Sequence, residues 1–147
     1  MSDEDPMTQS VLFACNMNSV RSPMAAALLR RAAGDRLTVD SAGVYEGGLD
    51  PFVEIVMDEL GVAMRGHEPK TLTEVDLADF DVVIALTPEA ALAAQKRSPK
   101  AAVEFWDIEN PSEERGGRDA VVAAYARVRE ALARKLAQRF PYLYKKP

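Results

Sequence analysis

Short apolar runs alternate with longer segments of helical periodicity along this chain. The apolar runs are rich in Val, Ile, Leu and Ala, which is typical of buried strands. The longer segments carry apolar side chains at helical spacing, and several have Pro near their start or Gly after their end. The pattern predicts strands at residues 11–14, 37–43, 81–86 and 101–106, and helices at residues 23–33, 50–60, 88–95 and 119–140.

This regular alternation of strand and helix predicts an α/β fold, with a parallel sheet covered by helices on both faces. At 147 residues the chain is expected to form a single domain, residues 1–147, in which residues 1–8 are flexible. Ligands of such folds bind at the carboxyl ends of the strands. The loop after the first predicted strand lies at one of those ends and becomes the first candidate site.

In that region an apolar run, a short polar loop and the start of a helix follow one another within a few residues. Cys15 ends the first predicted strand, and Arg21 and Ser22 open the following helix. Backbone N–H groups in a turn of this kind can converge on a tetrahedral anion, next to the positive end of the helix. The guanidinium of Arg21 could grip two phosphate oxygens, and the Ser22 hydroxyl could stabilise a Cys15 thiolate, the nucleophilic form. The residues predicted to form the cradle are Asn16, Met17, Asn18, Ser19 and Val20.

A plainer interpretation is also open, because a free cysteine at the end of a strand is often simply buried. The loop lacks the Gly-Lys-Ser/Thr ending of a nucleotide-binding Walker loop, so that class of phosphate site is excluded. An Arg-Ser pair at this offset, between a strand and a helix, favours the functional interpretation.

Composition and net charge exclude several kinds of partner and binding site. The net charge of −5 argues against a nucleic-acid partner. Cys15 is the only cysteine, which excludes an intramolecular disulfide and a cysteine-only zinc site. His67 is the only histidine and is expected to be structural or exposed, so neither a metal nor a cofactor is expected. No apolar stretch reaches the ~18 residues of a membrane span, and we expect a cytoplasmic protein without a membrane partner.

The segment VLFACNMNSVRSPMA, residues 11–25, resembles the phosphate-binding loop of the low-molecular-weight protein tyrosine phosphatase family, which includes related arsenate reductases. The resemblance continues through DSAG, FDVVIAL and WDIENP, in the family's order. It implies a three-layer sandwich around a four-stranded parallel sheet, and a cysteinyl-phosphate intermediate formed without a metal. It also implies residue roles: Cys15 as the nucleophile, Arg21 as the phosphate clamp, Ser22 as the donor to the thiolate, and Asn18 as the loop-shaping residue held by Ser41.

Four positions depart from the family pattern. Met17 replaces a loop glycine, Val20 replaces a second loop cysteine, and Leu86-Thr87 replaces a Met-Asp pair. In the fourth, Asn110-Pro111 stands where the family has the Asp-Pro pair that carries the general acid, and asparagine cannot give up a proton at neutral pH.

Two roles are therefore open in this chain. Asp107, Glu109 and Glu113 are the carboxylates near Asn110, and Asp107 is the preferred substitute acid because it follows the fourth strand. The tyrosines that flank an aryl substrate in the family are missing, which leaves Tyr45 as the best candidate for an aromatic wall.

The expected function is phosphomonoester hydrolysis, on protein phosphotyrosine, with phosphorylated proteins or small phosphomonoesters as partners and inorganic phosphate as product. One alternative is a phosphate- or phosphoprotein-binding module without turnover, which Asn110 would explain. The other is arsenate reduction, for which the single Cys15 would need an external thiol.

Overall fold

Four parallel strands form the central sheet, in the order β2-β1-β3-β4. The computed structural model describes residues 8–64 and 66–144, so most of the segment expected to be flexible lies outside the described residues. The four-stranded parallel sheet expected from the sequence is confirmed. The strands are β1 (Ser10–Cys15), β2 (Thr38–Gly43), β3 (Val82–Ala85) and β4 (Val103–Phe105).

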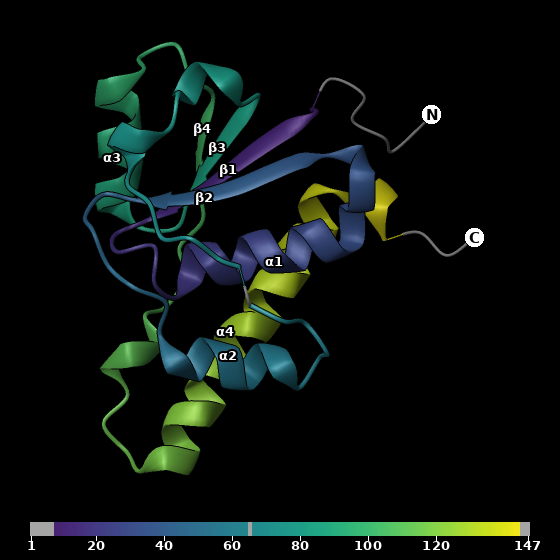
Figure 1. The fold of residues 1–147 in the computed structure, drawn as a ribbon, viewed down its shortest axis with the longest axis vertical. Coiled ribbons are helices and arrows are strands. Elements are labelled where there is room, and N and C mark those ends of the chain that lie inside the picture. Colours follow the sequence, from purple (N-terminus) through teal and green to yellow (C-terminus); the bar gives the residue numbers. More distant parts are fainter. Residues whose placement is uncertain (1–7, 65, 145–147) are drawn as a thin grey trace.

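Helices cover both faces of this sheet, which confirms the predicted layers. Figure 1 shows α1, α2 and α4 on one face and α3 on the other. Each helix overlaps the segment that the apolar periodicity predicts. The helices are α1 (Arg21–Ala33), α2 (Pro51–Asp58), α3 (Pro88–Arg97) and α4 (Arg118–Arg139), and short 3₁₀ turns occur in several connections.

Alternation along β1 decides where Cys15 points. Val11, Phe13 and Cys15 belong to the core under α1, α2 and α4, whereas Leu12 and Ala14 pack with residues of α3 on the opposite face. Successive side chains of a strand point to opposite faces of the sheet. The thiol therefore lies on the same face as α1, at the end of the strand where that helix begins.

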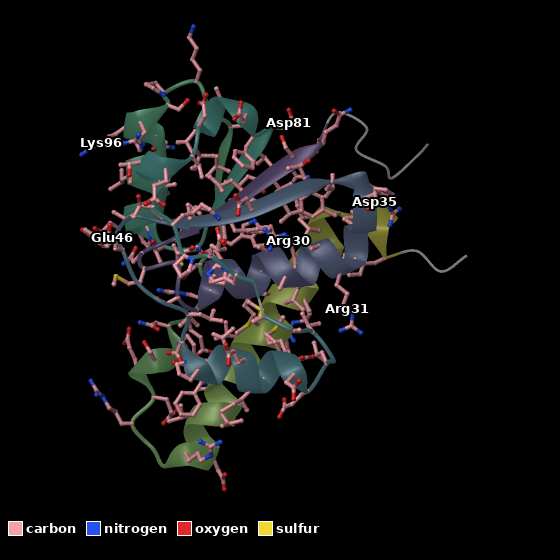
Figure 2. All side chains as sticks on the ribbon, in the orientation of Figure 1. Arg30, Arg31, Asp35, Glu46, Asp81 and Lys96 are labelled. Atoms are coloured by element: carbon pink, nitrogen blue, oxygen red, sulfur yellow. The ribbon has the colours of Figure 1, made fainter. Side chains whose placement is uncertain are left out.

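Side-chain contacts fix α1 and β4 against the sheet. Arg30 donates from Nε and Nη2 to the carbonyl oxygen of Val39 at 3.1 and 2.7 Å, and Figure 2 shows its side chain between α1 and β2. Trp106, directly after β4, is buried and meets Phe13 edge-on with ring centroids 6.2 Å apart, which places it in the core. Within the described residues, no helix combines the length and the apolar character that crossing a bilayer requires.

Candidate active site

Cys15 and Ser22 meet where β1 ends and α1 begins. The Cys15 Sγ lies 2.8 Å from the Ser22 Oγ, and both side chains are buried. No side chain caps the start of α1, and Pro23 in its first turn has no N–H to offer. The first backbone N–H groups of the helix are thus available to an anion bound at its N-terminus, where the helix dipole also favours negative charge.

Asn18 shapes the loop between these two elements. It is the only non-glycine residue with positive φ in the described part of the chain, at 52°. Its buried side chain donates from Nδ2 to the Ser22 Oγ at 2.9 Å and accepts from the Lys70 N–H at 3.0 Å. The left-handed turn falls on Asn18, so Met17 needs none of glycine's conformational freedom.

The expected partner of Asn18 differs in the structure. Ser41 is buried, but its hydroxyl has no hydrogen-bond partner among the described residues, so it does not hold the Asn18 side chain. The backbone N–H of Lys70 takes that place, because the chain after α2 returns beside the end of β2, where the Gly43 N–H donates to the Lys70 carbonyl oxygen at 2.9 Å.

A cavity of about 240 Å³ opens above the loop. It is smaller than the ~300–1,000 Å³ of pockets for drug-sized ligands, a size that suits an anion and the first atoms of its substituent. Within residues 8–64 and 66–144, no cluster of His, Cys, Asp and Glu is arranged to hold a metal ion. The cavity is lined by Cys15, Asn16, Met17, Ser19, Val20, Arg21, Asp50, Asn110 and Ser112.

Arg21 reaches from the start of α1 to the loop after β4. Its Nη1 donates to the carbonyl oxygen of Ile108 at 3.1 Å, which holds the guanidinium at the cavity. The nucleophile, the phosphate clamp and the thiolate donor that the sequence predicts are therefore brought together, and the five predicted cradle residues lie between them.

This arrangement coincides with a family match over nearly the whole chain. Residues 10–146 match the family described as "Low molecular weight phosphotyrosine protein phosphatase". The chain belongs to this family.

Individual proteins are also similar to this chain over most of its length. The curated arsenate reductase of Bacillus subtilis (strain 168) is 28% identical over 128 residues, which is 87% of this chain and 92% of that protein. The solved structure of the Erwinia amylovora tyrosine phosphatase AmsI is 27% identical, with a TM-score of 0.75, and the match covers 90% of this chain and 93% of that one. A mutant of YwlE from Bacillus subtilis is 25% identical, with a TM-score of 0.78, over 94% of this chain and 100% of that one.

Asn110 lies in the cavity, where the resemblance to the family places the general acid. Its Oδ1 accepts from the backbone N–H of Ser112 at 3.1 Å and from the Ser112 hydroxyl at 2.6 Å. The amide thereby caps the short turn Pro111–Glu113. This member of the family thus keeps the loop and has an amide where the resemblance implies a carboxyl group.

Asp107 and Glu109 are not brought to the cavity. Trp106 and Ile108 are buried, and the exposed Asp107 between them points away because side chains alternate along an extended segment. Glu109 binds Arg127 through both carboxylate oxygens, at 2.7 and 3.1 Å, and this pairing lowers the pKa of Glu109. Glu109 is therefore held ionised, away from the thiol.

Glu113 and Tyr45 also lie outside the group of residues lining the cavity. Glu113 borders a separate hollow on the outer side of the loop after β4. Tyr45 is half-exposed, and its hydroxyl donates to Glu89 at the start of α3, which raises the pKa of the phenol. Only its backbone serves the loop, through an N–H that donates to the Asn16 carbonyl oxygen at 2.7 Å.

Three further residues support the loop, although their place in the sequence predicts no role in it. A Cβ on Gly43 would lie 2.7 Å from the Asn18 backbone nitrogen, so only glycine allows β2 to approach so closely. The Thr87 hydroxyl donates to the Asn16 Oδ1 at 2.7 Å and accepts the Ala90 N–H at 3.0 Å, which ties the loop to the start of α3. Asp50 joins the cavity through a backbone contact with Ser19. A glycine at a strand end and an Asp-Pro helix start are the signals that could have identified two of them.

His67 contacts the back of the loop. Its Nε2 lies 3.4 Å from the Asn18 carbonyl oxygen, and its pKa is lowered, chiefly because the ring is partly buried. The ring also borders a larger hollow of about 550 Å³ beside α1, which neither Cys nor Ser lines among the described residues. The expectation of a structural histidine agrees with this contact.

Proposed function

We propose that this chain hydrolyses phosphomonoesters through a cysteinyl-phosphate on Cys15, with protein phosphotyrosine as its substrate class. The observation that carries the proposal is the buried thiol 2.8 Å from the Ser22 hydroxyl, at the base of a cavity that Arg21 also lines. Family membership supports phosphatase chemistry in general. The substrate class rests on the family description and on the match to the tyrosine phosphatase AmsI.

The geometry suits a two-step reaction. In the first step the Cys15 Sγ attacks phosphorus, an S–P bond forms, and the P–O bond to the leaving group breaks. The developing charge on the phosphoryl oxygens is met by the loop N–H groups and by the Arg21 guanidinium. In the second step water attacks phosphorus, a P–O bond forms and the S–P bond breaks. Inorganic phosphate leaves with the oxygen of that water, and Ser22 donates to the thiolate that is regenerated.

The leaving group of the first step finds no acidic side chain at position 110, where the resemblance to the family implies the proton donor. Asn110 can donate a hydrogen bond but cannot release a proton. Proton transfer by a positioned acid typically contributes 10²–10⁴-fold, so we expect poor leaving groups to react slowly. In this proposal the enzyme hydrolyses activated aryl phosphates readily and phosphotyrosine more slowly.

Arsenate reduction is the second candidate, because curated relatives are arsenate reductases. A relay of disulfides within the chain requires further cysteines, and Cys15 is the only one in this sequence. Arsenate turnover would therefore require an external thiol to form a mixed disulfide with Cys15. This requirement makes the hydrolytic function the better supported one.

Steady-state assays test the proposal. We expect the native protein to hydrolyse 4-nitrophenyl phosphate and phosphotyrosine peptides, and we expect Cys15→Ser to abolish both activities. Arg21→Lys should retain the fold and lose most of the activity, because a lysine cannot hold two phosphate oxygens with a planar fork. Full activity in Cys15→Ser would overturn the mechanism. Phosphate binding without hydrolysis of even the activated ester would indicate a binding module, and arsenate turnover with glutathione alone would favour the reductase.

A further inference from the structure

Asp50 brings a carboxylate to the edge of the phosphate cavity. Its backbone N–H donates to the Ser19 carbonyl oxygen at 3.0 Å, so this residue is attached directly to the phosphate-binding loop. It is also the residue before α2, which places it at a fixed point of the fold. Asp50 lines the same cavity as Cys15 and Arg21.

Two neutral donors orient this carboxylate without cancelling its charge. The Phe52 N–H donates to Oδ1 at 2.8 Å, and the Tyr125 hydroxyl donates to Oδ2 at 2.7 Å. Burial, together with the Asp50 carboxylate, raises the pKa of the Tyr125 phenol, so Tyr125 stays protonated and remains a donor. Asp50 forms no ion pair within residues 8–64 and 66–144. Each carboxylate oxygen keeps a further lone pair for a ligand.

The other residues at the cavity mouth do not compensate for this charge. Asn110 uses its Oδ1 to accept from Ser112, so its NH₂ group is what remains for a ligand. Met17 is half-exposed, and none of the described residues that line the cavity is aromatic. Arg21 is the one cation among these lining residues, and the phosphoryl group occupies it in the proposed reaction. A substituent on the phosphoryl group therefore meets one negative charge, small polar groups and the apolar side chains of Met17 and Val20.

We infer that Asp50 is a specificity-determining residue, which favours phosphoryl ligands with an ammonium or guanidinium group close to the phosphoryl group and disfavours anionic ones. The inference rests on the proposed function for its meaning in catalysis, since it names the substrates that the same site selects. The physical reason is Coulombic: opposite charges several ångströms apart at a partly solvated surface attract enough to change an affinity severalfold. On a protein substrate, the preference would be for phosphotyrosine flanked by Lys or Arg.

Asp50→Asn separates charge from structure. Asparagine caps helices about as well as aspartate, so it can still accept the Phe52 N–H and preserve the start of α2. The change removes the negative charge and puts an NH₂ group in place of Oδ2, toward which the Tyr125 hydroxyl can turn to act as the acceptor. Asp107→Asn is the matched control, because it removes an exposed carboxylate of a nearby loop that does not line the cavity.

The probes are two arylphosphonates of nearly equal shape, one with a 4-trimethylammonium group and one with a 4-tert-butyl group. Calorimetric titration of the native protein should give about 5- to 10-fold tighter binding of the cationic probe. Asp50→Asn should reduce this preference to less than twofold, whereas Asp107→Asn should leave it unchanged. Added salt should weaken the preference in the native protein.

Equal affinity of the native protein for the two probes would overturn the inference, as would a preference that survives in Asp50→Asn. The corresponding phosphate esters keep the two claims distinct. If the esters are not hydrolysed while the phosphonates still discriminate, the proposed function fails and the inference stands. If Asp50→Asn slows both esters equally and leaves the phosphonate preference intact, the carboxyl acts on the leaving group instead, and the inference is wrong.

Discussion

At the scale of single residues, Asn110 limits the proposed reaction. Asn110→Asp should restore a proton donor at the cavity while keeping the cap on the Ser112 N–H, because aspartate caps equally well. We expect hydrolysis of phosphotyrosine to rise by up to ~10²-fold, whereas the rate with 4-nitrophenyl phosphate changes little, since nitrophenolate leaves without help. Steady-state rates over a series of aryl phosphates of rising leaving-group pKa measure the effect.

Asp107→Asn is the companion measurement. Asp107 is exposed and lies outside the cavity, so this substitution should leave the dependence on the leaving group unchanged. A selective loss of phosphotyrosine hydrolysis in Asp107→Asn, with no gain in Asn110→Asp, would show that Asp107 reaches the leaving group after all.

At the scale of elements, the close approach of β2 to the loop after β1 constrains the site. Gly43→Ala would place a methyl group 2.7 Å from the Asn18 nitrogen and 2.9 Å from the Asn16 oxygen, which are backbone atoms that cannot rotate away. We expect a loss of about 1–3 kcal/mol in the free energy of unfolding, and weaker binding of phosphate. Urea unfolding and phosphate titration measure the two effects.

Gly48→Ala provides the control at this scale. A methyl group on Gly48 meets nothing within 4 Å, and the residue lies in the same connection between β2 and α2. It should leave stability and phosphate affinity almost unchanged. Equal effects from the two substitutions would contradict the claim that the close approach at Gly43 shapes the loop.

At the scale of the whole molecule, protonation of His67, which contacts the loop at Asn18, should make the free energy of unfolding depend on pH. Partial burial lowers its pKa below 6.5, and the nearby charges of Lys70, Arg30 and Asp40 act on it as well. The unfolded chain then binds a proton more readily than the folded one, so this contribution is complete above pH ~6.5 and is lost as the pH falls below that value. The free energy of unfolding should decrease more between pH 7.5 and 5.5 in the native protein than in His67→Gln. An identical decrease in the two proteins would contradict this coupling.

The fold could be predicted at this scale because local sequence and global topology agree. Apolar runs of strand length, such as residues 81–86, alternate with helices that Pro and Gly delimit, and this order leaves a parallel sheet as the natural arrangement. The proximity of Cys15, Arg21 and Ser22 could also be predicted from the sequence, for a related reason. They lie at the two ends of one short loop, so their proximity depends on few residues of intervening chain.

The rest of the site comes from segments distant in sequence, which a single sequence does not place. Asp50 and the backbone N–H of Lys70 meet the loop only through the packing of the chain around β2 and α2. Asp107 was favoured for its position after the fourth strand, but the burial of Trp106 and Ile108 turns it outward. The direction in which the Asp107 side chain points depends on which of its neighbours are buried in the core. The sequence alone does not show which neighbours these are.

Trapping of the phosphoenzyme is the most direct test of the central claim, that Cys15 carries the phosphoryl group. The protein would be mixed with 4-nitrophenyl phosphate, quenched rapidly, digested under conditions that preserve thiophosphates, and analysed by mass spectrometry. We expect one phosphoryl group on the peptide that contains Cys15, accumulating with a burst of nitrophenolate. A phosphoryl group on another residue, or turnover without any phosphoenzyme or burst, would contradict the account.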